Sequence, residues 1–305
     1  YKNIEKKAEL QQKQIVLSFS ILDKMKGVAV FTTVESLQKR LNSSINAVDT
    51  AFVPTMGALH EGHLELVRRA LSQASQVVVS IFVNPTQFNS TEDLINYPRT
   101  LENDIALLES VGNVIVFAPS VDEMYPSNYS DVAVDLGELA NVMEGKFRPG
   151  HFNGVVNVVK RLFDIVNPTF ALFGEKDFQQ LAIIKKMVFE LALEVAIIPC
   201  ETVREDSGLA KSSRNARLSN TQKEDALIII RTMNYIRENA LSFSPVELKS
   251  KAVSYFETGN LDLEYLEIID SVSLQEAIEW EGEIRVCIAA FCGEVRLIDN
   301  MDLTQ

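Results

Sequence analysis

The chain has 305 residues, of which 47% are hydrophobic and 23% are charged, and its formal net charge is −13 at pH 7. This length is natural for two domains, and the composition is ordinary for a globular protein. The acidic charge argues against a nucleic-acid partner, and no apolar run approaches the roughly 18–20 residues that a membrane span needs.

The first two dozen residues differ in texture from the rest of the chain. Residues 2–14 are charged and rich in glutamine, and residues 15–22 form a brief apolar stretch. That stretch is too short for a signal peptide, and no small-residue cleavage site follows it. We therefore expect residues 1–24 to be an N-terminal extension and the core to begin near Met25, with an ordinary N-terminal helix as the alternative.

Up to about residue 200, the apolar pattern alternates between strands and helices. Strands are expected at residues 28–31, 51–53, 76–82, 114–117, 169–173 and 194–198, and helices at 34–41, from 61, at 97–109, 155–166 and after 177. The β-branched run at 76–82 is typical of a strand that is buried on both faces of a parallel sheet. We predict a Rossmann-like, doubly wound α/β domain at residues 25–200, with a loop at 138–150.

After residue 217 the pattern changes. Helices are expected at 219–239 and 245–259, followed by strands at 263–269, 284–291 and 294–297. Cys292 and Gly293 are a candidate hairpin turn between the last two strands. We therefore predict a smaller α+β domain at residues 201–305 that closes over the site.

The most informative stretch is PTMGALHEGHLELVRRA at residues 54–70. We interpret it as the end of a strand, a tight turn at Gly57 and a helix that begins near Glu61. His60 and His63 then fall in the first helical turn and on the same face. A helix N-terminus presents unpaired N–H groups and a partial positive charge, which suit a phosphate. Simple capping or a chance pair of histidines is the structural alternative.

A second signal lies far downstream, in the polar loop Lys211-Ser212-Ser213-Arg214. The pair of motifs, HxGH and a K-S-S-R loop, resembles the signature of the HIGH/KMSKS nucleotidyltransferase superfamily, whose members split ATP between the α and β phosphates. Neither motif is specific alone.

Further stretches make the resemblance narrower. In chain order they are FVNPTQF, YPRT, RPGHFNGV, FGEKDFQQL, REDSGLAKSSRN and a closing AAF-C-G-E-VRLIDN. Together with PTMGALHEGH, these stretches cover residues 28–300 and resemble the bacterial pantoate–β-alanine ligase family. The resemblance implies that pantoate and β-alanine are joined through a pantoyl adenylate, with release of AMP and pyrophosphate. It also implies ATP and Mg²⁺ as substrate and cofactor, and a cytoplasmic homodimer.

The resemblance also assigns roles to individual residues. The ATP-binding residues would be Met56, Gly57, Ala58, Leu59, His60, Glu61, Gly62, His63, Gly174, Glu175, Lys176, Asp177, Val203, Lys211, Ser212, Ser213 and Arg214. In this family the residue at the position of His63 is usually designated as catalytic. We expect His60, Lys176 and Arg214 to act beside it. Lysine would neutralise the departing pyrophosphate, and the planar arginine fork suits phosphate oxygens. The family commonly has methionine at position 211, so the role of Lys211 stays open.

The substrate residues follow in the same way. Gln87 and Gln180 match the pantoate-binding glutamines, and an amide can hold both a hydroxyl and a carboxylate. Pro54 is expected in the apolar wall, Asn84 as a polar neighbour and Asp104 near Mg²⁺. Without the resemblance, the glutamines and the aspartate would be read as surface residues.

Two alternatives remain open at this stage. One is another HIGH-type adenylyltransferase, which retains the adenylyl group in its product; Gln87, Gln180 and the closing motif argue against it. The other is a non-catalytic nucleotide- or RNA-binding relative of the tRNA synthetases, which the acidic charge disfavours. Three scattered cysteines fit the buried thiols of a reducing cytoplasm.

Overall fold

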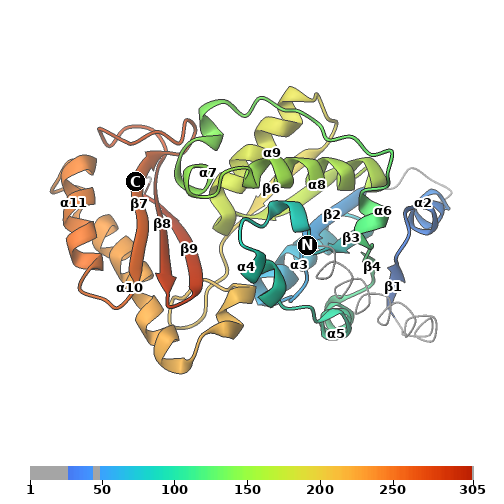
Figure 1. The fold of residues 1–305 in the computed structure, drawn as a ribbon, viewed down its shortest axis with the longest axis horizontal. Helices are drawn as coiled ribbons and strands as arrows, with labels where there is room; N and C mark the ends of the chain where they lie inside the picture. Colours follow the sequence, from blue (N-terminus) through green and yellow to red (C-terminus); the bar gives the residue numbers. More distant parts are fainter. Residues whose placement is uncertain (1–26, 44–48, 304–305) are drawn as a thin grey trace.

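The computed structural model describes residues 27–43 and 49–303. The predicted extension at 1–24 and the start near Met25 lie outside the described residues. Figure 1 shows two bodies: a sheet with helices on both faces and, beside it, a smaller sheet backed by two helices.

The larger sheet is parallel throughout. Its strands are β1 (Val28–Phe31), β2 (Thr50–Thr55), β3 (Gln76–Ile81), β4 (Val114–Phe117), β5 (Phe170–Gly174) and β6 (Ala196–Cys200). They lie in the order β1-β4-β3-β2-β5-β6, and each neighbouring pair is parallel. From the middle of the sheet, β2, β3 and β4 follow one another in one direction and β5 and β6 in the other, and β1 lies beyond β4 at the edge. The direction of strand succession therefore reverses between β2 and β5. Ligands of such sheets bind beyond the carboxyl ends of the strands at this switch point.

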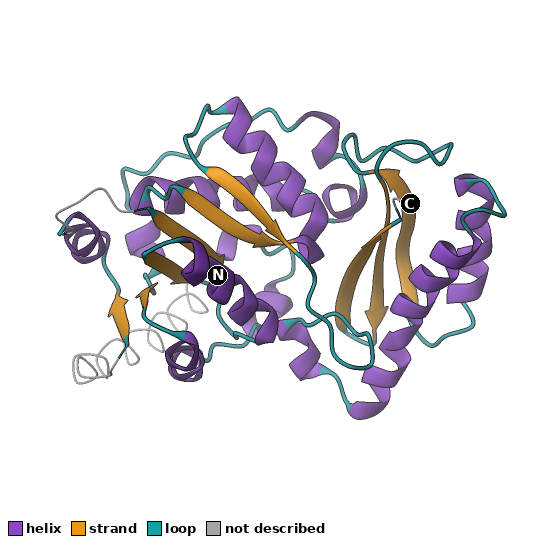
Figure 2. Ribbon diagram, turned by 180° about the vertical axis from the view of Figure 1, so that it is seen from behind, coloured by secondary structure: helices purple, strands orange, loops and turns teal. Residues whose placement is uncertain are grey.

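Helices cover both faces of this sheet, which confirms the predicted doubly wound α/β class. They are α2 (Val34–Asn42), α3 (Glu61–Gln73), α5 (Leu101–Val111), α8 (His151–Val166) and α9 (Phe178–Glu190). Helices α3 and α5 pack on one face, and α2, α8 and α9 pack on the other (Figure 2). In β3, Val78 joins one apolar cluster while Val77 and Val79 join the other. This strand is therefore buried on both faces, as its β-branched run predicts.

Short helices occupy segments for which the sequence predicts neither a helix nor a strand. They are η1 (Pro85–Gln87), α4 (Thr91–Asn96), α6 (Val121–Met124), η2 (Gly137–Ala140) and α7 (Met143–Phe147), and η3 (Glu175–Asp177) and η4 (Ser213–Arg217) lie in the predicted phosphate-facing segments. These pieces are too short to show an apolar period. Helix α8 begins at His151 rather than at 155, because Gly150 adopts a left-handed conformation with φ +81° and starts the helix there.

The smaller sheet is antiparallel, with the order β7-β8-β9. It comprises β7 (Asp262–Asp270), β8 (Ile284–Cys292) and β9 (Val295–Asp302), and it packs against α10 (Asn220–Asn239) and α11 (Pro245–Phe256). Gly293 has φ +60° in the turn between β8 and β9, where the hairpin is predicted. Strand β9 extends past the predicted end at residue 297. Its polar end, which includes Asp299 and Asn300, returns to the larger sheet.

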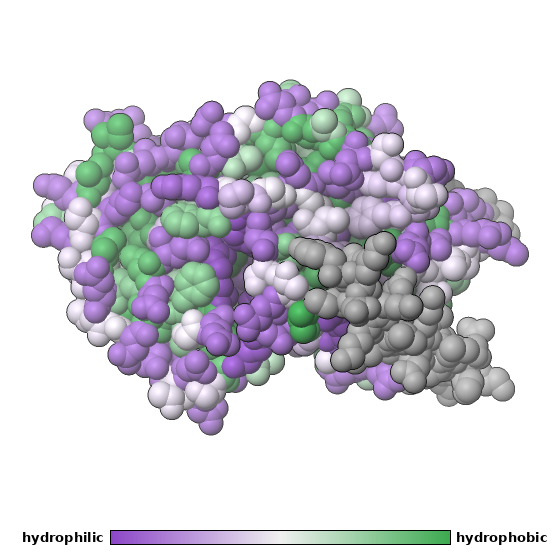
Figure 3. Space-filling model, viewed as in Figure 1, coloured by the Kyte–Doolittle hydropathy of each residue, from purple (hydrophilic) through white to green (hydrophobic). Residues whose placement is uncertain are grey.

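Hydrophilic and hydrophobic residues are interspersed on the face shown in Figure 3, and hydrophilic residues surround the hollow between the two bodies. Within residues 27–43 and 49–303, no helix has the length and apolar character required to cross a membrane.

Candidate active site

A cavity of about 250 Å³ opens at the carboxyl ends of β2 and β5, beside the smaller sheet. The predicted residues that line it are Pro54, Met56, His60, Gly62, His63, Gln87, Gly174, Lys176, Asp177, Gln180, Val203, Lys211, Ser212, Ser213 and Arg214. The predicted residues absent from its lining are Gly57, Ala58, Leu59, Glu61, Asn84, Asp104 and Glu175. The fold thus brings the three predicted phosphate-facing segments together around one cavity.

The two histidines form a capping box at the start of α3. The His60 ring Nδ1 accepts the Gly62 N–H at 3.2 Å, and the His63 Nδ1 accepts the His60 N–H at 3.3 Å. Their ring centroids lie 4.1 Å apart. His60 has an extended backbone and is the N-cap, so it precedes the first helical turn in which the sequence places it. The same-face prediction holds for the rings, because both line the cavity.

These contacts determine the state of the two imidazoles. Since each Nδ1 accepts a backbone hydrogen bond, the hydrogen of the neutral ring is on Nε2. Burial and the nearby Lys176 and Lys211 lower the pKa of His60 to about 4. Burial, His60 and Lys176 lower the pKa of His63 to about 3. In the ligand-free protein at neutral pH, both rings are therefore neutral donors, a point that the sequence leaves undecided.

Two glycines permit this arrangement. Gly57 has φ +78°, and a Cβ there would lie 2.9 Å from the Ile81 Cγ2. A Cβ on Gly62 would lie 2.9 Å from the His60 Cε1, so a side chain at this position would displace the capping ring. Both positions therefore require glycine.

Asp104 has a different environment from the one predicted for a metal ligand. Its side chain is fully buried; Oδ1 accepts from the Leu59 N–H at 2.8 Å and the Thr100 hydroxyl at 3.1 Å, while Oδ2 accepts from the Ala58 N–H at 3.0 Å. Burial raises the pKa of Asp104 although these hydrogen bonds oppose the shift. This geometry does not fit the predicted Mg²⁺ role, because both oxygens are used in holding the histidine turn. No group of three or more metal-ligating side chains occurs among the described residues.

The second segment is the turn η3, between β5 and α9. The Lys176 ammonium lies in the cavity wall, 3.7 Å from the Asp177 carboxylate. A Cβ built on Gly174 would meet nothing within 4 Å, so the space in front of this glycine is open.

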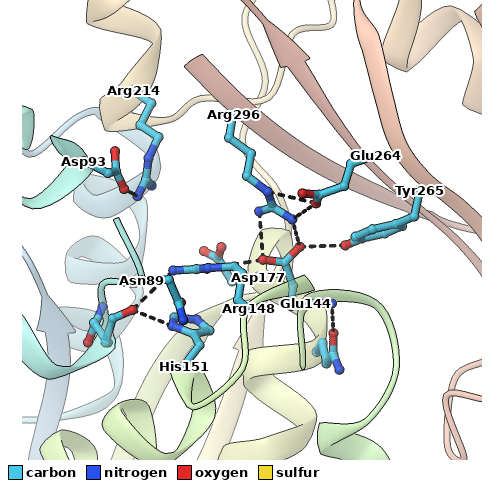
Figure 4. Close-up of polar contacts among 12 residues, drawn as sticks. Asn89, Asp93, Glu144, Arg148, His151, Asp177, Arg214, Glu264, Tyr265 and Arg296 are labelled. Atoms are coloured by element: carbon cyan, nitrogen blue, oxygen red, sulfur yellow. Dashed lines mark hydrogen bonds and ion pairs between the residues drawn. The ribbon is translucent and has the colours of Figure 1, made fainter. Parts of the chain in front are cut away.

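The third segment, 211–214, is attached to the histidine turn. The Ser213 hydroxyl donates to the Ala58 carbonyl at 2.9 Å, and the Ser212 hydroxyl accepts the Arg214 N–H at 3.3 Å. The Arg214 guanidinium pairs with Asp93 of α4 at 2.7 Å (Figure 4). Arg217 binds the other oxygen of Asp93 at 3.1 Å. The sequence does not single out Asp93, because nothing local marks it as a partner of residues more than a hundred positions away.

The predicted substrate residues occupy two layers. Gln87 lines the cavity, and its Nε2 donates to the Met56 sulfur at 2.9 Å. Asn84 lies behind Gln87, fully buried; its Nδ2 donates to the Gln87 Oε1 at 3.3 Å and to the Gly154 carbonyl at 3.2 Å. Gln180 lines the cavity from α9. Asn84 therefore supports Gln87 from behind rather than facing the cavity itself.

An ionic cluster around the buried Glu144, which the sequence does not predict, joins the two bodies at the wall of the cavity (Figure 4). Arg296 of β9 binds both oxygens of Glu144 of α7, at 2.7 and 2.9 Å, and also pairs with Glu264 of β7. Tyr265 donates to Glu144 at 2.8 Å, and Arg148 pairs with Glu144 at 3.2 Å. Burial alone would raise the pKa of Glu144, but Arg296 and Arg148 outweigh it and lower the pKa to about 2.

Comparison with known proteins gives a consistent result. The sequence profile of the pantoate–β-alanine ligase family matches residues 29–302. The pantothenate synthetase of Bacteroides thetaiotaomicron is 49% identical over 276 residues, covering 89% of this chain and 98% of the relative. That of Phocaeicola vulgatus is 51% identical over 275 residues, covering 88% of this chain and 97% of the relative.

Two solved structures are similar to this fold. The crystal structure of pantothenate synthetase from Thermus thermophilus aligns with a TM-score of 0.86 at 40% identity, covering 91% of this chain and 100% of that one. Pantoate–β-alanine ligase from Francisella tularensis, complexed with β-γ ATP and β-alanine, aligns with a TM-score of 0.77 at 37% identity, covering 91% of this chain and 98% of that one.

Proposed function

Because the chain belongs to the pantoate–β-alanine ligase family, we propose that the cavity at the ends of β2 and β5 is where it binds ATP, pantoate and β-alanine. The chain is an ATP-dependent ligase that condenses pantoate with β-alanine to pantothenate. One observation supports the proposed location best: the histidine turn, the 174–177 turn and the 211–214 loop line the same cavity.

The proposed chemistry has two steps. First, a carboxylate oxygen of pantoate attacks the α-phosphorus of ATP, the bond from that phosphorus to the bridging oxygen of the β-phosphate breaks, and pyrophosphate leaves. The product is pantoyl adenylate. Second, the amine of β-alanine attacks the acyl carbon, loses a proton, and expels AMP together with the oxygen that came from pantoate.

The two histidines would stabilise the charge that develops on the α-phosphate during the first step. Their Nε2–H groups are donors in neutral rings, and the capping box fixes both rings before any ligand arrives. Donors held in place in this way need no reorganisation when the charge develops. Lys176 would contact the departing pyrophosphate, and Arg214, oriented by Asp93, would contact phosphate oxygens.

Pantoate would lie between the two glutamines. Gln87 and Gln180 both line the cavity and offer a donor and an acceptor each. Pro54, Phe82 and Phe88 line the same cavity and provide apolar surface for the geminal methyl groups.

Mg²⁺ would arrive with ATP. Proteins commonly hold this ion through nucleotide phosphates and water with one or two carboxylates, so a cluster of protein ligands is not needed.

The resemblance further supports a cytoplasmic homodimer, and sedimentation analysis would measure the oligomeric state. A monomer at assay concentration would contradict the dimer.

The adenylate route is tested by the path of an oxygen atom. With pantoate labelled with ¹⁸O in its carboxylate, the label should appear in the phosphate of AMP once β-alanine is added. Label in inorganic phosphate would mean an acyl phosphate instead. A product that retained the adenylyl group, with no free AMP, would favour the alternative adenylyltransferase.

A further inference from the structure

The polar end of β9 binds two of the segments that line the cavity and are proposed to contact the phosphates of ATP. We refer to this part of the cavity as its phosphate side. Asp299 and Asn300 are both only 5% exposed, and both line the cavity. They lie in the part of β9 beyond residue 297, and their side chains bind elements from different parts of the chain.

Asn300 binds the turn that carries Lys176. Its Nδ2 donates to the Glu175 carbonyl and to the Lys176 carbonyl, both at 2.9 Å. Its Oδ1 accepts from the Arg285 guanidinium at 2.6 Å. The orientation of the amide is determined by its partners, because arginine can only donate and carbonyls can only accept.

This contact sets the direction of two peptide groups. In a trans peptide the N–H points away from the C=O, so fixing the carbonyls of Glu175 and Lys176 on Asn300 turns the N–H groups of Lys176 and Asp177 to the opposite side of the turn. The backbone from which the Lys176 side chain extends is held by the same two bonds. Arg285 adds a second contact, since its guanidinium lies 4.2 Å from the ring centroid of Phe178, at the start of α9.

Asp299 binds the hairpin that leads into the 211–214 loop. Its carboxylate accepts two hydrogen bonds from the Arg204 guanidinium, at 2.6 and 3.0 Å. Arg204 also donates to the Gly208 carbonyl at 3.1 Å, and Lys211 closes the hairpin through the Val203 carbonyl at 2.9 Å. Such paired arginine–carboxylate bonds fix orientation as well as adding energy.

We propose that Asn300 is a positioning residue that holds Lys176 at the phosphate side of the cavity, and that Asp299 does the same for the 211–214 loop through Arg204. This inference rests on the proposed function only in naming the phosphates of ATP as the ligand. The inference also gives the smaller sheet a structural role in the site. The end of β9 positions two of the segments that line the cavity, in addition to any movement by which the smaller domain closes over it.

The test measures binding of MgATP by calorimetry, without pantoate, in Asn300→Leu and Lys176→Ala and in the double variant. Asn300→Leu removes the two donors at similar volume and should weaken MgATP binding about tenfold, since misplacement of a binding group by about 1 Å is costly. In the Lys176→Ala background the same change should weaken binding less than about twofold, because the effect passes through the lysine. The KM for pantoate should stay within about twofold of the wild type.

Asn157→Leu is the matched control. Asn157 is a buried asparagine of α8 that also binds backbone groups, with its Oδ1 at 2.7 Å from the Val132 nitrogen, and it does not line the cavity. It should lower the unfolding midpoint and leave MgATP affinity unchanged. If Asn300→Leu does not fold, Asn300→Ser, which is smaller and polar, is measured in the same way.

Two outcomes overturn the proposal. One is an unchanged MgATP affinity in a folded Asn300 variant. The other is a loss of MgATP affinity on Asn300 substitution that is equally large in the wild-type and Lys176→Ala backgrounds. The proposed function fails separately, if the wild type binds MgATP but forms no pantothenate.

Discussion

Replacing Asp104 with asparagine separates a structural role of this carboxylate from a metal-binding one. The carboxylate accepts the N–H groups of Ala58 and Leu59 in a fully buried position. Asparagine keeps one acceptor oxygen but turns an NH₂ group toward the other backbone N–H, which then has no acceptor. A buried donor without a partner costs roughly 1–3 kcal/mol, and the loss of a charged acceptor adds to this. We expect Asp104→Asn to lower the free energy of unfolding by about 2–4 kcal/mol.

The assay combines urea unfolding with a Mg²⁺ titration of activity at saturating ATP. The structural role predicts a lower unfolding free energy and a lower kcat, because the histidine turn moves, with an unchanged Mg²⁺ concentration for half-maximal rate. Thr100→Val, which removes the remaining hydrogen bond to the same carboxylate and leaves both backbone contacts, is the milder control. An unchanged free energy of unfolding together with a raised Mg²⁺ requirement would refute the structural role and support Asp104 as a metal ligand.

Three further predictions concern the contacts around the site. Glu144→Gln should destabilise the fold by about 3 kcal/mol in urea unfolding, since it removes a buried carboxylate and leaves the partly buried Arg296 with only Glu264 as a charged partner; an unchanged midpoint would contradict this. Asp93→Asn should raise the KM for ATP several-fold by releasing Arg214, with little loss of stability because the pair is partly exposed; a KM equal to that of the wild type would count against it. The two capping histidines have pKa values of about 4 and about 3, below the 6.5 of an unfolded chain. The unfolded state therefore binds more protons below pH 6.5, so stability should fall from pH 6.5 toward 4, and an equal or higher urea midpoint at pH 5 would argue against neutral buried rings.

Much of the fold follows from local pattern. The run at 76–82 predicts a strand that is buried on both faces, and its valines do alternate between the two apolar clusters. Ser219 and Ser244 each begin a helix with a capping box, which leaves a signal in the sequence. The full length of β9 could not be predicted, because Asp299 and Asn300 are polar and give no strand pattern until their partners in other elements are known.

In the candidate site, too, the residues that belong to local sequence motifs could be predicted, and the residues that depend on contacts distant in the sequence could not. The motifs that contain His63 and Lys176 could be recognised because their residues are close together in sequence, and the fold brings both to one cavity. The roles of Asp93 and Glu144 could not be predicted, since Arg214, which binds Asp93, and Arg296, which binds both oxygens of Glu144, lie more than a hundred residues from them in the sequence. For Asp104, residue type suggests a metal ligand, but only the fold shows that its oxygens face backbone N–H groups.

The most direct test of the account is the rate of AMP formation from MgATP by the wild type and by His63→Asn. Asparagine places Oδ1 where Nδ1 accepts the capping bond, so the turn keeps its cap while the Nε2–H donor is lost. The account predicts that the wild type releases AMP only when pantoate and β-alanine are both present, and that the folded variant is slower by about 10²–10³-fold. AMP release at the wild-type rate by His63→Asn, or AMP formation without pantoate, would contradict it.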